Sequence, residues 1–360
     1  MQALVTGGTG FIGSHVVRQL LKQKINVRCL VREGSRRSNL DGLGVSYVIG
    51  DLRDAHSLKV ALMDCRMLFH VAADYRLWAP DPAEMNRVNI EGTRALFQAA
   101  GDAGLEKIVY TSSVAAVGRP PSPPAPLPHE GDRAHHNPYS APSPGSLREG
   151  GRRPGEGFEE LDPTPDQLIG PYKQSKFASD ILARDFAKQG LPLVIVNPAA
   201  PIGAQDVKPT PTGKMIVDFL NGRMPGYVDT GMNFIDVEDV AAGHWLAAEK
   251  GRIGERYILG NKNMTLKDFL ESLAQISGRR APRFRIPYAL AWLAGAVSTG
   301  LSSVTRREPA IPLDGVRMAH APMYYDASKA VRELGLPQTP IETAIEKAVR
   351  WFREHGYVRH

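Results

Sequence analysis

Cysteine and long hydrophobic runs are both scarce in this sequence. Its 360 residues include only two cysteines, Cys29 and Cys65, too few for a disulfide framework and without the spacing of zinc ligands. Cys29 lies in an apolar segment, where we expect a buried thiol. No uninterrupted apolar stretch reaches the roughly 18 to 20 residues of a transmembrane helix, so we expect no membrane span. The first predicted strand begins at Ala3, which leaves no room for a signal peptide and favours a cytoplasmic protein.

The sequence also has only a modest excess of positive charge. The net charge is +6, with 23% charged and 42% hydrophobic residues. This composition is typical of a globular protein and suggests no nucleic-acid partner. The pair His135 and His136 has no carboxylate or cysteine at ligand spacing, so we predict no metal site. The length suffices for one large domain or two unequal ones.

A glycine-rich turn stands at the start of the chain. Gly7, Gly10 and Gly13 follow a short apolar strand and open a helix, with Phe11 and Ile12 between the last two glycines. Such glycines permit a tight turn, close approach of the backbone to a pyrophosphate and close packing of helix on strand. The free N–H groups of the helix then face the phosphates. The pattern predicts a dinucleotide-binding site.

Strands and helices alternate after this turn. The alternation predicts an α/β fold with a doubly wound, parallel, Rossmann-type sheet. We assign residues 1–200 to an NAD(P)-binding domain and 201–360 mainly to a smaller C-terminal α/β substrate-binding region, from which some segments return to the core. Residues 119–170 are rich in proline and predict an irregular insertion. The expected strands are residues 3–6, 26–31, 45–49, 67–71, 107–113 and 193–197, and a long helix is expected over 82–103.

The C-terminal half carries further helical patterns. Helices are expected after Gly213, over 237–249, from Lys267 and over 341–355, with a strand over 256–259. The apolar segment 287–303 favours a core or lid helix over a helix on a membrane surface. Four arginines form the densest basic cluster, which favours a solvated loop over a site for a phosphorylated or membrane-associated substrate. They are Arg279, Arg280, Arg283 and Arg285.

The end of the second predicted strand bears on the choice of cofactor. NAD sites usually carry an acidic side chain there, which holds the ribose 2′-OH. This sequence has Arg32 instead, with Arg36 and Arg37 just beyond. A cation can pair with a 2′-phosphate, so NADP is favoured over NAD. The alternative is a solvated basic loop.

Three residues predict the chemistry. Tyr172 and Lys176 are four residues apart in a predicted helix and therefore share one face. Ser113 ends a predicted strand at the edge where a doubly wound sheet binds ligands. An ammonium and an oxidised nicotinamide would lower the pKa of the phenol, which is ordinarily near 10. Ser113 would hold the substrate oxygen while Tyr172 exchanges its proton. A chance surface pair is the alternative.

Together, several motifs resemble an extended short-chain dehydrogenase/reductase over nearly the whole chain. The similarity is greatest to the hopanoid-associated sugar epimerase group, also called dihydroflavonol-reductase-like. The motifs are the glycine turn, Gly50-Asp51-Leu52, His70-Val-Ala-Ala73, Asn89-Ile-Glu-Gly-Thr93, Thr111-Ser-Ser113 and Tyr172 with Lys176.

The resemblance implies further roles. Tyr172 would be the acid/base, and Lys176 would contact the ribose and lower the tyrosine pKa. Asn197 and Arg317 would bind substrate. A homodimer packed through the helices near residues 82–103 and 172–188 is also implied. The residues implied to meet the cofactor, besides the glycines, are Phe11, Ile12, Arg32, Arg36, Asp51, Leu52, Ala72, Ala73, Tyr172, Lys176 and Pro198.

Departures from the family pattern narrow the function. Val114 and Ala115 stand where sugar dehydratases carry acids, and a phosphate-binding arginine is absent near Asn233. We therefore expect either of two NAD(P)-dependent enzymes. The first is an epimerase of a sugar or polyol, in hopanoid side-chain biosynthesis. The second is an NADPH-dependent ketone or aldehyde reductase. A non-catalytic dinucleotide sensor or scaffold is a third alternative.

Overall fold

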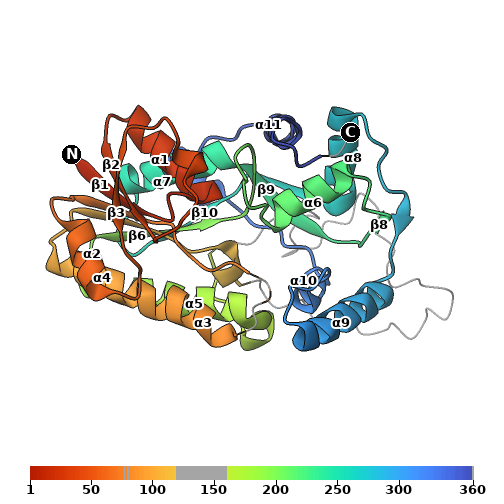
Figure 1. Cartoon of the computed structure of the whole chain (residues 1–360), viewed down its shortest axis with the longest axis horizontal. Coiled ribbons are helices and arrows are strands. Elements are labelled where there is room, and N and C mark those ends of the chain that lie inside the picture. Colours follow the sequence, from red (N-terminus) through yellow and green to blue (C-terminus); the bar gives the residue numbers. More distant parts are fainter. Residues whose placement is uncertain (77, 79–80, 119–159, 359–360) are drawn as a thin grey trace, which may run out of the picture.

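A seven-stranded parallel sheet forms the larger part of the molecule (Figure 1). The computed structural model describes residues 1–76, 78, 81–118 and 160–358. The strand order is β10-β6-β5-β4-β1-β2-β3, and every pairing is parallel. The predicted doubly wound α/β fold is confirmed. The strands are β1 (Gln2–Thr6), β2 (Asn26–Val31), β3 (Val45–Ile49), β4 (Met67–His70), β5 (Lys107–Thr111), β6 (Leu193–Pro198) and β10 (Arg256–Leu259).

Helices cover both faces of this sheet because its strands are apolar on both sides. Along β1 and β4, Val5 and Phe69 point into one core, while Leu4 and Leu68 point into the other. Figure 1 shows helices above the sheet and helices below it. Those above are α1 (Phe11–Lys22) and α7 (Val237–Lys250), and those below are α2 (Ala55–Leu62), α4 (Thr93–Asp102) and α5 (Gly170–Lys188).

The long helix predicted over 82–103 is helical throughout but not uniform. It begins with α3 (Pro82–Asn86), passes through a π-helical turn (Arg87–Gly92) and continues as α4. Asn89, buried in the π-helical turn, donates from Nδ2 to Ser175 Oγ at 3.0 Å and to the Asp74 carbonyl at 2.8 Å. The irregular turn therefore ties the segment after β4 to helix α5.

A smaller layered region follows the sheet. Its three strands, β7 (Ala200–Ile202), β9 (Gly231–Asp236) and β11 (Lys262–Thr265), pair in the order β11-β9-β7. Three helices share its own hydrophobic core, in which Phe234 stacks on Phe269 at 4.3 Å between ring centroids. Two elements of this half of the chain belong to the larger part of the molecule. Strand β10 forms one edge of the large sheet, and helix α7 packs on the sheet beside α1. The helices are α6 (Pro211–Leu220), α8 (Leu266–Ser277) and α11 (Ile341–Glu354).

One apolar helix lies at the surface of the molecule. The segment predicted as a core or lid helix is α9 (Tyr288–Thr305), which lies at the lower right of Figure 1 and contacts α10 (Leu313–Met318). Its large apolar side chains are exposed, so the core alternative is wrong, and the lid alternative stays a prediction. Two short strands, β8 (Gly226–Tyr227) and β12 (Phe284–Arg285), precede it and pair in parallel. Within the described ranges no helix is both long enough and apolar enough to cross a bilayer.

The predicted insertion falls largely outside the described residues. Residues 119–159, which include His135 and His136, belong to that part. The described remainder, 160–169, is irregular apart from a 3₁₀ turn (Pro165–Gln167). It ends at Gly170, where α5 begins.

Candidate active site

The glycine turn after β1 is as tight as the sequence predicts. Gly7 has a φ of +71°, and a Cβ atom there would lie 2.6 Å from the amide nitrogen of Ala72. A Cβ atom on Gly13 would lie 2.1 Å from the Gly7 carbonyl oxygen. Both contacts are to backbone, which cannot rotate away. The turn therefore accepts only glycine at these two positions.

The start of α1 fits a pyrophosphate. Gly10 is its N-cap and has no side chain, so no side-chain oxygen occupies the amide groups of the first turn. Phe11 and Ile12 are the first helical residues and are half-buried. A dinucleotide would place its phosphates against these amides, where the positive end of the helix dipole favours an anion.

The other predicted cofactor contacts lie at the same edge of the sheet. Ala72 and Ala73 follow β4, and the Ala72 amide donates to Thr6 Oγ1 at 3.3 Å. Asp51 and Leu52 follow β3. The Arg53 guanidinium hydrogen-bonds Asp51 with an Nε–Oδ1 distance of 2.8 Å and holds the pKa of that carboxyl below its usual range. All four residues stand at carboxyl ends of strands. Ala72 and Ala73 lie next to the point between β4 and β1 where the strand order reverses, and Asp51 and Leu52 lie at the edge strand β3.

Arg32 and Arg36 are exposed after β2. Neither forms an ion pair with another described residue. The charge of Arg32 also contributes to the lowered pKa of Asp51, which places it beside the end of β3. Arg37 instead covers the Tyr47 ring at 4.7 Å. Arg32 and Arg36 are therefore available to an anionic group at this edge.

Ser113 and Tyr172 come together at the end of β5. Tyr172 lies in the first turn of α5, and its phenol shares a hydrogen bond with the Ser113 hydroxyl. The pKa of Tyr172 is raised, because burial disfavours the phenolate more than this hydrogen bond favours it. The lowering that the sequence analysis expected from Lys176 is not seen. The neutral phenol is the form that the surroundings stabilise.

The contacts of Lys176 explain why it does not lower the pKa of Tyr172. Its side chain is buried, and Nζ donates to the Thr111 carbonyl at 3.0 Å and lies 5.2 Å from the Tyr110 ring centroid. Burial lowers the pKa of Lys176 to about 8, while the charge of Asp180 opposes that shift. The ammonium is thus held beside β5, one helical turn from the phenol.

Asp180 is a functional candidate that the sequence analysis missed. This fully buried carboxylate accepts from Ser112 Oγ at 2.6 Å and from Asn197 Nδ2 at 3.4 Å. Burial raises its pKa, and the charges of Arg256 and Arg184 oppose the rise. No sequence motif marks it, although it lies one turn after Lys176 on α5.

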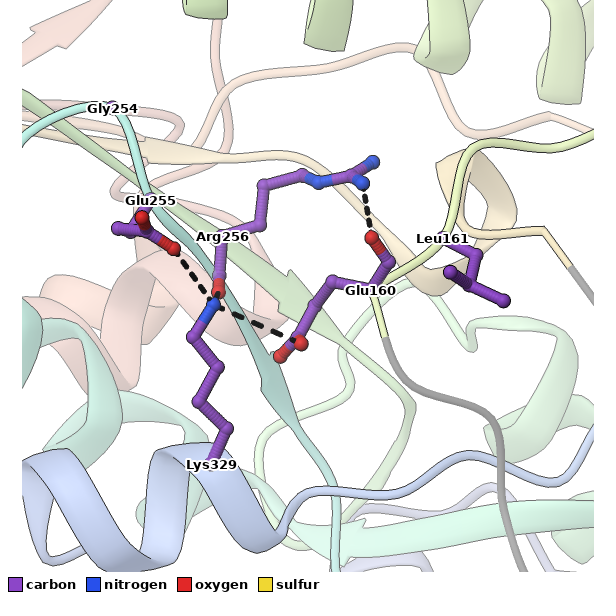
Figure 2. A pocket seen from close by; sticks show the side chains of 6 residues that line it. All are labelled: Glu160, Leu161, Gly254, Glu255, Arg256 and Lys329. Carbon is purple, nitrogen blue, oxygen red and sulfur yellow. Dashed lines mark hydrogen bonds and ion pairs between the residues drawn. The ribbon is translucent and has the colours of Figure 1, made fainter.

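Figure 2 shows a pocket at the outer side of β10, where charged side chains pair with one another. Lys329 Nζ lies 3.0 Å from a Glu255 oxygen and 3.8 Å from a Glu160 oxygen, and Arg256 donates to the Glu160 carbonyl. Arg256 also pairs with Asp162 at 2.9 Å and with Asp180 at 3.5 Å. The pocket contains none of the predicted site residues. Its charges fasten residues 160–162 to β10 and to Asp180.

The two predicted substrate residues differ in their surroundings. Asn197 is fully buried, and its Nδ2 donates to the Ser113 carbonyl at 3.0 Å. Its amide therefore supports the segment after β5 that carries Ser113. Arg317 is exposed on α10 and pairs with Asp314 at 3.5 Å. A Cβ atom on Gly170 would lie 2.5 Å from Asp314 Oδ2, so α10 borders the first turn of α5. Pro198 ends β6 and is buried.

Two further buried residues, neither of which is a predicted site residue, hold segments together at the carboxyl edge of the sheet. Asn39 donates to the carbonyls of Thr9 at 3.2 Å and Gln205 at 3.1 Å, joining the segment after β2 to the glycine turn. His70 bonds Thr6 Oγ1 at 2.7 Å and Thr93 Oγ1 at 3.0 Å. Cys29 is buried as predicted, which raises its pKa to about 12. The described residues contain no group of three metal-ligating side chains.

Known proteins resemble this chain over almost its full length. A protein of Synechocystis named "Putative dihydroflavonol 4-reductase" is 45% identical over 99% of this chain and 95% of its own. The Methylococcus capsulatus protein named "Sterol demethylase protein B" is 34% identical over 99% of this chain and 100% of its own. The crystal structure of gox2253 is 40% identical, with a TM-score of 0.80 and 99% of each chain covered.

The family model points the same way. The model of the NAD dependent epimerase/dehydratase family matches residues 3–142 and 146–260, which include the glycine turn, Ser113, Tyr172 and Lys176. The Pseudomonas aeruginosa structure titled a nucleoside-diphosphate-sugar epimerase is 26% identical, with a TM-score of 0.70 and 99% or more of each chain covered. The chain therefore belongs to the NAD-dependent epimerase/dehydratase family and is one of its nicotinamide-dinucleotide-dependent enzymes.

Proposed function

We propose that this enzyme reduces a ketone or aldehyde to an alcohol with NADPH. The observation that carries the proposal is the hydrogen bond between Ser113 and Tyr172, beside the buried Lys176, at the carboxyl end of β5. A bound nicotinamide dinucleotide would supply the hydride. The chain itself has to hold the carbonyl oxygen and give it a proton.

Ser113 and Tyr172 can share that work. A carbonyl oxygen placed between them would accept from Ser113 Oγ and Tyr172 Oη, and Tyr172 would release its proton to that oxygen as the hydride reaches carbon. The raised pKa of Tyr172 supports this direction, because a proton donor must be protonated at neutral pH. The buried ammonium of Lys176 is held at this edge by the Thr111 carbonyl, where the resemblance implies that it contacts the cofactor ribose.

The charges and the relatives support NADPH and a reductase. Arg32 stands where a 2′-phosphate would bind and forms no ion pair with another described residue. A Stigmatella aurantiaca relative, 28% identical, is named a ketoreductase of a farnesylated quinoline oxide. The Methylococcus capsulatus relative is named for a sterol. These names favour a large apolar substrate.

An epimerase of a sugar or polyol is the second candidate. The family model and the Pseudomonas aeruginosa structure favour it. Here Tyr172 would first accept the proton of an alcohol and later return it to the same oxygen. A bound nicotinamide dinucleotide would take a hydride from the carbon and give it back on the other face. A hopanoid side chain or its sugar precursor would be such a substrate, as the resemblance implies. Asn197, whose amide donates to the Ser113 carbonyl, supports a nucleotide-sugar substrate less well.

Nucleotide content separates the two candidates. The protein is purified without added nucleotide and denatured, and the released compounds are identified by mass spectrometry. A reductase is expected to be empty and to bind NADPH reversibly, whereas retained stoichiometric NAD would favour the epimerase. Arg32→Glu is expected to weaken NADPH binding about tenfold or more and NADH binding little. Arg223→Glu, exposed in the smaller region, is the matched control.

Tyr172→Phe tests the chemistry. Because it removes the proton donor, we expect turnover to fall about 10² to 10⁴-fold while NADPH binding by fluorescence titration is unchanged. Tyr257→Phe serves as control and is expected to stay active. It removes a phenol hydroxyl on β10 that donates a hydrogen bond to Glu333. Near-full activity of Tyr172→Phe would contradict the assignment. We also propose the homodimer through α4 and α5 that the resemblance implies.

A further inference from the structure

Helix α9 has its apolar side turned outward. Leu290, Leu293, Val297, Leu301 and Val304 recur at three- and four-residue spacing and so form one stripe along the helix. Their side chains are between 55% and 83% exposed. A surface helix of a globular protein ordinarily carries polar residues on its outward side.

The inward side of α9 is small and polar. Ser298 Oγ accepts from the Ile311 amide at 3.1 Å, and Thr299 Oγ1 accepts from the Leu313 amide at 3.0 Å. Gly295 and Ser302 are buried on the same side, and a Cβ atom on Gly295 would lie 3.2 Å from Val316. These contacts with α10 and the loop before it fix the rotation of α9 about its own axis. The apolar stripe therefore faces outward and cannot turn toward the protein.

Charge and aromatic residues are arranged around the stripe. No charged residue occurs from Ile286 to Thr305. Exposed arginines stand at both ends, Arg283 and Arg285 before the helix and Arg306 and Arg307 after it. Arg285 pairs with Asp229 at 2.8 Å, and the other three form no ion pair with a described residue.

Exposed aromatic residues accompany these arginines. Phe284 is 76% exposed, and Tyr288 and Trp292 are exposed on the first turns of α9. Aromatic side chains of this kind favour the boundary between water and lipid. Eighteen helical residues span about 27 Å, so the stripe can lie along a surface over its whole length.

We propose that α9 docks this protein on the surface of an anionic lipid bilayer. The stripe would lie among the acyl chains, and the arginines at its ends would face lipid phosphates. A protein partner would need acidic groups at both ends of an apolar groove, whereas an anionic bilayer presents negative charge on every side. Because α10 lies between α9 and the first turn of α5, a docked α9 brings the active-site edge near the bilayer.

Vesicle flotation with the full chain tests the proposal. The protein is mixed with vesicles of phosphatidylcholine containing 30% phosphatidylglycerol, or of phosphatidylcholine alone. We expect it to float with the anionic vesicles and about tenfold less with the neutral ones, and to be released as salt rises from about 0.1 to 0.5 M. Equal flotation with both vesicles, or flotation with neither, would overturn the proposal.

A pair of triple variants locates the contact. Leu293→Glu, Val297→Glu and Leu301→Glu together are expected to reduce flotation about tenfold or more. Val60→Glu, Met63→Glu and Ile253→Glu, exposed elsewhere, add the same charge and are expected to leave it unchanged. Retained flotation of the α9 variant would overturn the proposal. So would a loss of dimer mass in that variant together with absent flotation, since a second copy would then cover the helix. NADPH binding reports folding in each variant.

Discussion

At the scale of single residues, we predict that Lys176 makes the active site sensitive to pH. Burial lowers its pKa to about 8, so its ammonium is present below that pH and lost above it. Tyr172 does not titrate in this range, because burial raises its pKa. We therefore predict that kcat/KM for carbonyl reduction is constant from pH 6 to 7 and falls as pH rises through about 8. Initial rates between pH 6 and 10 measure this.

Asp180 is expected to set the position of that fall. Its charge opposes the lowering of the Lys176 pKa, so Asp180→Asn should move the decline of kcat/KM to a lower pH. Asp162→Asn is the matched control, because Asp162 pairs with the same two arginines, Arg256 and Arg184, at 2.9 and 3.0 Å. Removing a partner of buried charges costs about 3 kcal/mol, so thermal unfolding is recorded for both variants. A folded Asp180→Asn enzyme with the original profile would contradict this role.

At the scale of elements, the packing of α1 on the glycine turn can be broken by one methyl group. Gly13→Ala would place Cβ 2.1 Å from the Gly7 carbonyl oxygen. The backbone must shift, which we expect to cost about 1 to 3 kcal/mol of stability and to weaken NADPH binding about tenfold or more. Denaturant unfolding and fluorescence titration measure the two effects.

Gly44→Ala is the control for the same change. Nothing lies within 4 Å of a Cβ atom at Gly44, and its φ is not in the left-handed region. Both properties should therefore stay as in the parent protein. If Gly13→Ala bound NADPH as tightly as Gly44→Ala, the close approach of β1 and α1 would not be needed for the site.

The elements of the large sheet could be predicted because each is a local pattern. Residues 67–69 and 108–110 are continuous apolar runs between helical patterns, which is typical of buried parallel strands. The small sheet could not be predicted. Strand β7 has three residues, and its partner β9 is some thirty residues further along the chain, so neither a run nor a turn signal marks the pairing.

Helix α9 shows a second limit. Its periodic apolar residues predicted a helix correctly, but period alone does not say which side faces the protein. The inward side is chosen by Ser298 and Thr299, whose bonds to two backbone amides after α9 form only in the folded chain. For the same reason the spacing predicts Tyr172 and Lys176 as site residues but gives no sign of Asp180, whose partners Arg256 and Ser112 come from distant segments.

At the scale of the whole molecule, the smaller region meets the sheet around the active site. Tyr325 Oη donates to the Val114 carbonyl at 3.1 Å, one residue after Ser113, and Asp314 lies against Gly170 at the start of α5. Substrate specificity would then depend on α10 and the segment around Tyr325, and hydride transfer would depend on the sheet edge. Such a division would explain how one sheet can serve reductases and epimerases.

The outer surface of α4 and α5 offers a place for a second copy. A groove between these helices is lined by Arg94, Gln98, Ile181 and Phe186, and Ile181 is 39% exposed. We predict a homodimer packed through this groove, because a second copy would bury Ile181 at its centre. Ile181→Glu should then give a monomer, measured by light scattering during gel filtration. Ile253→Glu, 61% exposed after α7, should remain a dimer. An Ile181→Glu protein of dimeric mass would exclude this face as the interface and leave the α9 stripe as the next surface to test.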